Sequence, residues 1–190
     1  MFQFTGLFGV VAGIFSFSAY LFYIIAIVKG KTKPNRSTWF IWAFIGLMLA
    51  ISYKASGAED TIWVPISEAI APSIIALLSV KYGVGGADKI DIFAFLGSLV
   101  SLFLWWYYDS AVIALLTNLA IDFFAAIPTI KKSWINPEHE DRFAWSLTTM
   151  GNIFNLFAID KLMFGVLIYP IYTFLIDGVI TGLLFKKKYG

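Results

Sequence analysis

The chain has 190 residues, of which 59% are hydrophobic, 18% aromatic and 14% charged, and its formal net charge is +2. A domain of this length has too little interior to bury so much apolar surface. Composition therefore excludes an ordinary soluble protein and predicts an all-α membrane protein. The chain contains no cysteine and only one histidine. This excludes disulfides, thiolate chemistry and a multi-histidine metal site within one chain, and we expect no metal and no cofactor.

Seven apolar segments are long enough, or nearly so, to cross a bilayer as helices, which takes about 20 mostly apolar residues. Their continuous apolar character is typical of helices and not of the alternating strands of a membrane barrel. The first segment lacks a basic start and is too long for a cleavable signal peptide, so we expect it to remain as a span. The predicted spans are 4–28, 38–54, 61–80, 91–107, 109–130, 142–159 and 162–185.

Basic residues between the spans predict the orientation. If the N-terminus lies outside, twelve lysines and arginines fall on the inner side and only Lys54 and Lys161 remain outside. Cytoplasmic loops carry such an excess, so we expect an outer N-terminus, a cytoplasmic C-terminus and a multi-pass protein of the plasma or inner membrane. The inner residues are Lys29, Lys31, Lys33, Arg36, Lys81, Lys89, Lys131, Lys132, Arg142, Lys186, Lys187 and Lys188.

An internal repeat relates the two halves of the chain. A shift of 103 residues pairs Trp42 with Trp145, and a shift of 105 pairs Pro65 with Pro170. Because each repeat holds three helices, a single connecting span gives both the same orientation, which is the parallel repeat known among transporters. The predicted units are a first triple-helix bundle at 1–83, a connector at 84–107 and a second triple-helix bundle at 108–190.

This 3+1+3 arrangement with an outer N-terminus, together with the segment Ile-Pro-Thr-Ile-Lys-Lys-Ser-Trp at 127–134, resembles a prokaryotic branch of the SWEET and PQ-loop superfamily. That superfamily includes sugar uniporters, proton-coupled lysosomal amino-acid exporters and the KDEL receptor, and nicotinamide riboside carriers share its architecture. The family's Pro-Gln pair reads Pro128-Thr129 here. The resemblance implies a site between the bundles, lined by aromatic and asparagine side chains such as Trp145 and Asn152.

Three acids lie inside predicted spans: Glu68, Asp122 and Asp177. At a rise of 1.5 Å per residue they fall in one slab on the order of 10 Å thick near the midplane, where the sequence places no lysine or arginine. Ionisable groups are costly at that depth and indicate function. Either these acids are protonated and able to release a proton, or they line a wet cavity that accepts a cation or an amine. Neutral acids that only link helices are the structural alternative.

Helical spacing places further polar residues of the second bundle on shared faces. Such stripes are costly against lipid, so we expect them to face one another or a shared cavity. Two alternatives stay open: the polar residues only link the helices, and Trp145 belongs to the aromatic belt at the inner boundary. The predicted substrate- or proton-binding residues are Asp122, Asp177, Glu68, Asn118, Asn152, Asn155, Trp145, Thr148 and Thr173.

Prolines within or at the edges of the spans predict kinks, because each removes a backbone hydrogen bond. We interpret Pro65, Pro128 and Pro170 as hinges for motion of one bundle against the other, with purely structural kinks as the alternative. His139 lies in a polar, turn-forming loop, where we expect it to be solvated.

Together these features predict a small-solute transporter that works by alternating access, and not an enzyme. We expect a lipid bilayer around it and a small polar solute of the sugar, amino-acid or vitamin type, with proton coupling left open. The sequence contains no phosphate-binding glycine loop and no nucleic-acid-binding face. A cation channel, a KDEL-receptor-like binding protein without transport, and a homo-oligomer are the alternatives.

Overall fold

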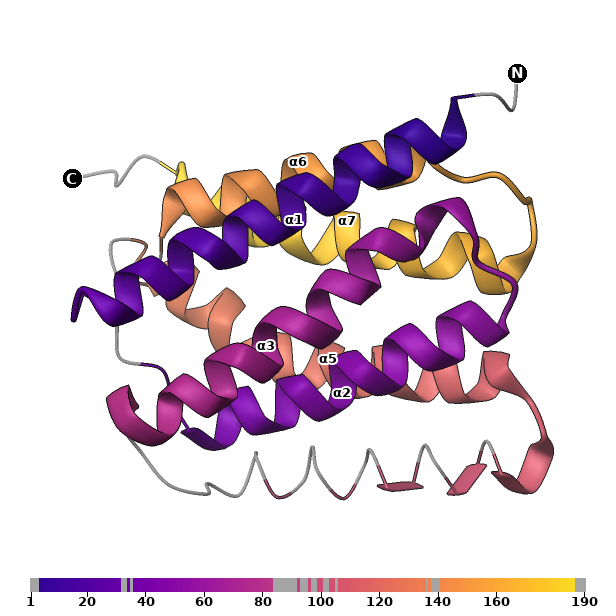
Figure 1. The fold of residues 1–190 in the computed structure, drawn as a ribbon, viewed down its shortest axis with the longest axis horizontal. Coiled ribbons are helices and arrows are strands. Elements are labelled where there is room, and N and C mark those ends of the chain that lie inside the picture. Colours follow the sequence, from indigo (N-terminus) through magenta and orange to yellow (C-terminus); the bar gives the residue numbers. More distant parts are fainter. Residues whose placement is uncertain are drawn as a thin grey trace.

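The computed structural model is an assembly of packed helices (Figure 1). It describes residues 4–31, 34, 36–83, 92, 96, 99–100, 103–104, 106–135, 137 and 141–186. Within these residues all regular structure is helical, which confirms the all-α prediction. The elements are α1 (Thr5–Val28), α2 (Arg36–Ala55), a short 3₁₀ turn η1 (Asp60–Ile62), α3 (Trp63–Tyr82), α5 (Ala111–Ile135), α6 (Arg142–Phe157) and α7 (Phe164–Leu184).

The helix boundaries follow the predicted spans, and the bounds differ by at most five residues at either end. The largest difference is at α5, which continues past the predicted end at residue 130 to Ile135. The start of α6 is set by Asp141, whose carboxylate accepts hydrogen bonds from the N–H groups of Phe143 and Ala144 at 2.9 and 3.0 Å. The predicted span 91–107 lies mostly outside the described residues.

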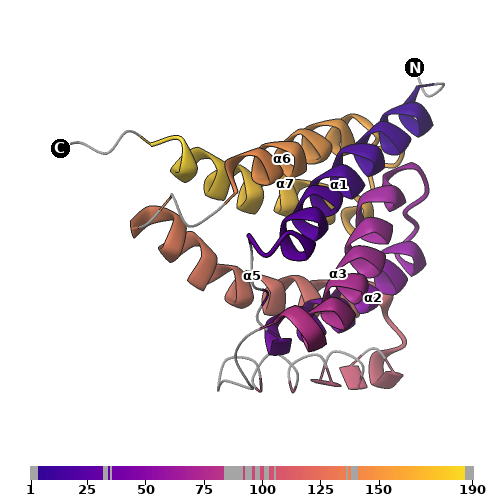
Figure 2. The same ribbon diagram turned by 60° about the vertical axis from the view of Figure 1, so that its left-hand side comes forward.

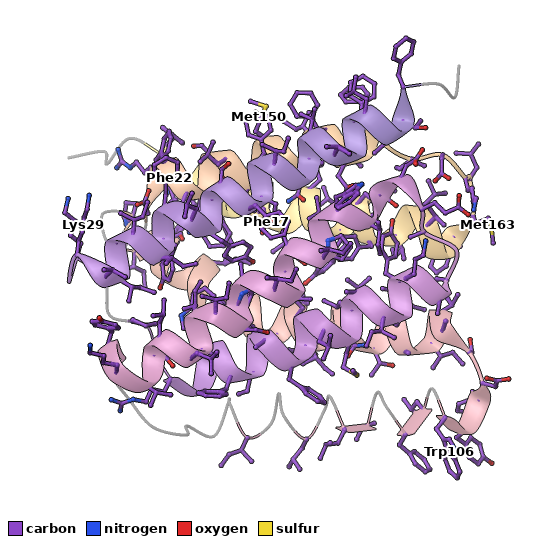
Figure 3. The ribbon with its side chains drawn as sticks, viewed as in Figure 1. Phe17, Phe22, Lys29, Trp106, Met150 and Met163 are labelled. Atoms are coloured by element: carbon purple, nitrogen blue, oxygen red, sulfur yellow. The ribbon has the colours of Figure 1, made fainter. Side chains whose placement is uncertain are left out.

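Three helical segments of the described chain are long and apolar enough to cross a membrane: Thr5–Val28, Asp60–Tyr82 and Phe164–Leu184. The apolar stretches Trp39–Ala55 in α2 and Ala111–Phe124 in α5 are shorter. Large apolar side chains also cover the outside of the bundle, and Phe22 and Met150 point away from it in Figure 3. Such a continuous apolar exterior is typical of a surface that faces lipid.

The six long helices of the described chain pack in a ring, each against two main neighbours. α3 packs against both α1 and α2, and α7 packs against both α5 and α6. Contacts of α1 with α6 and of α2 with α5 complete the ring. In Figure 1, α1, α3, α5 and α7 run from right to left and α2 and α6 run in the opposite direction, and Figure 2 shows the same helices from another side.

Glycines at the helix crossings allow the backbones to approach closely, as in other membrane helix pairs. A Cβ on Gly9 of α1 would overlap the backbone carbonyl oxygen of Asp60 in η1. A Cβ on Gly46 of α2 would overlap the backbone carbonyl oxygen of Glu68 in α3. At these crossings no side chain separates the two backbones, so the position of Glu68 depends directly on Gly46.

Tyr53 of α2 contacts helices from both halves of the chain in the core. It is fully buried, and its ring centroid lies 4.6 Å from that of Tyr169 in α7. Its hydroxyl donates to the carbonyl oxygen of Val166 at 2.7 Å and lies 2.8 Å from the Thr61 hydroxyl oxygen. One side chain therefore joins α2, η1 and α7.

Tyr53→Phe is expected to destabilise the protein by about 1–3 kcal/mol, because the buried carbonyl of Val166 loses its donor. Thermal unfolding of the purified protein in detergent measures the change. Tyr108→Phe, at an exposed position, removes the same atom and is expected to change stability by less than about 0.5 kcal/mol. Equal stabilities for the two variants would contradict the assigned hydrogen bond.

Candidate functional site

Three carboxyl groups from three helices lie near one another inside the bundle. Glu68 is on α3, Asp122 on α5 and Asp177 on α7. Glu68 interacts electrostatically with both aspartates, and Asp177 interacts with Asp122. All three side chains are half-buried, so each keeps accessible surface although it lies among the helices. We call Glu68, Asp122 and Asp177 the acidic cluster.

Tyrosines surround two members of the acidic cluster. The hydroxyl of Tyr169 donates a hydrogen bond to Oε2 of Glu68, and the hydroxyl of Tyr172 donates to Oδ2 of Asp122 at 2.7 Å. Tyr20 of α1 lies within electrostatic range of all three carboxyl groups. Tyrosine hydroxyls of α7 therefore bond two of the acids, and a tyrosine of α1 lies within electrostatic range of all three.

Asp177 is held by α6. Nδ2 of Asn152 donates to Oδ2 of Asp177 at 2.7 Å. The hydroxyl of Thr149 lies 3.2 Å from the backbone carbonyl oxygen of Asp177 and 2.7 Å from the hydroxyl of Thr181. These contacts fix the rotation of α7 against α6, so the Asp177 carboxyl group points toward Asn152 of α6.

Three buried asparagines have polar atoms without a partner in the described part of the chain. Asn118 and Asn152 are each 1% exposed, and Asn155 is 0% exposed. The unpartnered atoms are Oδ1 of Asn118, Oδ1 of Asn152 and both side-chain atoms of Asn155. A buried polar atom without a partner costs about 1–3 kcal/mol. Such atoms in a native protein call for a functional or structural reason.

No lysine or arginine of the described chain is among the charged groups that act on Glu68, Asp122 or Asp177. The described residues also contain no group of three His, Cys, Asp or Glu side chains arranged to hold a metal ion. The three carboxyl groups are thus near enough to influence one another but are not gathered around one point as the ligands of a metal would be.

The other predicted site residues make local contacts. The hydroxyl of Thr173 lies within hydrogen-bond distance of the backbone of its own helix, as does that of Thr148. Thr173 nevertheless lies on the face of α7 that carries Tyr169 and Asp177, since the three are spaced by four residues. The carbonyl oxygen of Trp145 accepts a hydrogen bond from the Thr181 hydroxyl at 3.0 Å.

The predicted hinge prolines occupy different positions in their helices. Pro170 lies inside α7, and Pro128 lies within the bounds of α5. Pro65 is the third residue of α3, in the first turn, where proline is tolerated because the N–H groups of that turn have no helical acceptor. Pro72 lies further inside α3. His139 lies outside the described residues.

The sequence reasoning missed the tyrosines that bind the carboxyl groups. Tyr169, Thr173 and Asp177 continue one stripe with a spacing of four, so the signal for Tyr169 was present one turn before Thr173. Tyr172 lies on a different face of α7 and gave no comparable signal. Aromatic residues in membrane proteins are read first as interfacial anchors, which hides those that bind polar groups inside.

The chain matches no protein-family model, no curated protein and no solved structure. The resemblance to the SWEET and PQ-loop superfamily therefore stays a prediction.

Proposed function

We propose that the protein is a small-solute carrier that works by alternating access around the acidic cluster. One observation carries this proposal: the two groups of helices both contribute carboxyl groups to one place inside the bundle. Glu68 comes from the group α1–α3, and Asp122 and Asp177 come from the group α5–α7. A site shared between two groups changes its shape when one group moves against the other, as carriers with repeats require.

The packing pattern supports a two-fold repeat. Exchanging α1 with α5, α2 with α6 and α3 with α7 leaves the set of main helix contacts unchanged. In both groups the third helix packs against the other two, and corresponding helices run in the same direction (Figure 1). We therefore propose seven spans in a 3+1+3 order, with bundles at 1–83 and 108–190 and a connecting span at 84–107.

The ends of the bundle support the proposed orientation. Figure 3 shows Lys29 at one end of the bundle and Met163 and Trp106 at the other. The positive-inside rule assigns the Lys29 end to the cytoplasm. The end that carries the α2–η1 and α6–α7 loops then faces outward, in a plasma or inner membrane.

Acidic side chains inside such a bundle suit two tasks of a carrier. They can bind and release a proton during the transport cycle, and they can hold a polar solute by hydrogen bonds. Neither task requires a covalent step, so the proposed protein is not an enzyme. Asn118, Asn152 and Asn155 provide further polar atoms in the second group.

The two groups are tied together at the proposed outer end. The Lys161 ammonium pairs with Oε1 of Glu59 at 2.6 Å and lies 3.3 Å from the carbonyl oxygen of Gly57. Lys161 belongs to the α6–α7 loop, and Glu59 belongs to the loop before η1. We propose that this pair, with the bond from Tyr53 to Val166, closes the outer side of the carrier in this conformation.

The ion pair between Lys161 and Glu59 contributes to this conformation over a defined pH range. The Lys161 ammonium, which donates a hydrogen bond to Glu59, holds the pKa of that carboxyl below its usual range. The contribution of the pair to this conformation is therefore present above about pH 4.3, the ordinary pKa of a glutamate. It is lost as the pH falls through the lowered pKa of Glu59.

Locking this outer contact is expected to stop transport. The chain has no cysteine, so Glu59→Cys with Lys161→Cys creates one pair that a short reducible bifunctional thiol reagent can bridge. Uptake of solute into proteoliposomes should fall to the level of protein-free vesicles after bridging. It should return after reduction, because the outer side can open again.

A bridge within one group provides the matched control. The Thr5 hydroxyl lies 2.6 Å from Oδ2 of Asp60, and both belong to the group α1–α3. A bridged Thr5→Cys, Asp60→Cys protein should keep its uptake. Full uptake by the bridged Glu59–Lys161 protein would refute alternating access at this end, and conductance far above carrier turnover would indicate a cation channel instead.

A further inference from the structure

We infer that the acidic cluster binds a small organic cation whose charged group carries several N–H donors, such as a primary ammonium or a guanidinium. The inference rests on the proposed carrier function and names the class of its solute. It is carried by the charges of the cluster and by the kind of polar atoms that remain unpartnered around it.

The charge balance of the site favours a cation. Glu68, Asp122 and Asp177 interact with one another, and no lysine or arginine of the described chain is among the charged groups that act on them. Each has a single side-chain donor, whereas a carboxylate accepts at about four lone-pair positions. Acidic groups that are short of both charge partners and donors are stabilised by a ligand that brings both.

The unpartnered atoms of Asn118 and Asn152 call for hydrogen-bond donors, whereas Asn155 has both an acceptor and a donor without a partner. Nδ2 of Asn152 is used by Asp177, and the Oδ1 atom of the same buried amide has no partner within the described residues. Oδ1 of Asn118, one helical turn before Asp122, is also buried and unpartnered. Both atoms are acceptors, so the missing groups are hydrogen-bond donors. A ligand rich in carboxylate or carbonyl oxygens would leave them unpaired.

The arrangement suits an organic cation better than a bare metal ion. The described acids do not form a group that could surround a metal. The Tyr169 hydroxyl bonds Glu68, and Tyr20 lies within electrostatic range of all three carboxyl groups. An ammonium or guanidinium brings positive charge together with several N–H donors, which carboxylate and amide oxygens accept.

The test compares two pairs of probes, each with a charged and a neutral member of similar shape, and adds a cation without N–H donors. The purified full chain is placed in lipid nanodiscs, and calorimetry measures the binding of n-butylguanidinium, n-butylurea, n-pentylammonium, 1-pentanol and tetramethylammonium. We expect each charged donor to bind at least about tenfold more tightly than its neutral counterpart, a difference of about 1.4 kcal/mol. Tetramethylammonium, which has the charge and no N–H donor, should bind more weakly than n-pentylammonium.

Two variants assign the binding to the cluster. Asn118→Leu removes an unpartnered acceptor and keeps the number and branching of the side-chain heavy atoms, so it should weaken n-butylguanidinium binding about tenfold or more while the protein stays folded, as thermal unfolding will show. The double variant Asp122→Asn, Asp177→Asn should abolish binding of this probe. Asp109→Asn removes an acid outside the bundle, at a residue with φ of 48° that asparagine tolerates, and should leave binding unchanged.

The outcomes separate this inference from the proposed function. Equal binding of charged and neutral probes, or binding of neither charged probe, overturns the inference. Equal binding of tetramethylammonium and n-pentylammonium overturns the requirement for donors. Charge-selective binding without counterflow of labelled n-butylguanidinium in proteoliposomes supports the inference and contradicts transport of this solute class. Counterflow of a neutral sugar without binding of any charged probe supports the carrier and overturns the inference.

Discussion

Asp122→Asn and Asp177→Asn are each expected to reduce pH-dependent uptake in proteoliposomes to the level of protein-free vesicles. Asparagine has the size of aspartate, and it still makes hydrogen bonds with Tyr172 or Asn152. It cannot carry the negative charge or exchange a proton. The substitution therefore removes the charge and the titration while it keeps the packing, and initial uptake rates at several pH values measure the effect.

Two controls make this result specific. Asp109→Asn changes a carboxyl group at an exposed position and should keep full uptake. Thermal unfolding should show that the variants of Asp122 and Asp177 remain folded, since the hydrogen bonds persist. Unchanged uptake in both variants would mean that these acids only link helices, as polar groups do in other bundles, and would remove them from the mechanism.

The second large effect is expected at Gly46. Gly46→Ala places a Cβ where the backbone carbonyl oxygen of Glu68 now lies, so α2 and α3 must separate. Overpacking of this kind costs about 1–3 kcal/mol. Because the backbone that must move carries Glu68, we expect the variant to lose both stability and uptake, measured by thermal unfolding and proteoliposome assays.

Gly178→Ala is the matched control for this change. A Cβ on Gly178 of α7 meets no atom within 4 Å. Alanine favours a helix over glycine by about 0.5–1 kcal/mol, so this variant should be as stable as the original protein or more stable. If Gly46→Ala were also neutral, the close approach of α2 to α3 would be contradicted.

Much of the fold was predictable because a membrane helix needs only length and apolar character. The segments 4–28 and 162–185 became α1 and α7 with differences of one or two residues. The end of α5 was less predictable. Lys131 and Lys132 were interpreted as loop residues, yet the helix includes them, since a helix can continue beyond the apolar layer that composition detects.

The depth of the three acids in the membrane was predictable, but their hydrogen-bond partners were not. Counting residues along each helix placed Glu68, Asp122 and Asp177 in one layer, because the rise per residue is constant. Which donors they meet depends on how each helix is rotated against its neighbours. That rotation is set by close crossings such as that of Gly46 in α2 with Glu68 in α3, and the periodicity within one helix does not contain it. The bond from Tyr172 to Asp122 could not be predicted for this reason.

The most direct test of the account is the accessibility of one cysteine inside the bundle. Thr173→Cys places a thiol on the face of α7 that carries Tyr169 and Asp177, in a chain without other cysteines. Two proteins are compared: Thr173→Cys alone, and Thr173→Cys combined with a bridged Glu59→Cys, Lys161→Cys pair. A membrane-impermeant thiol reagent is added to right-side-out or to inside-out vesicles that contain either protein. Without the bridge, the account predicts that the thiol at position 173 is modified from both sides of the membrane. With the bridge, it predicts that this thiol is modified from the cytoplasmic side alone. Protection from both sides, or equal modification from both sides of the bridged protein, would contradict it.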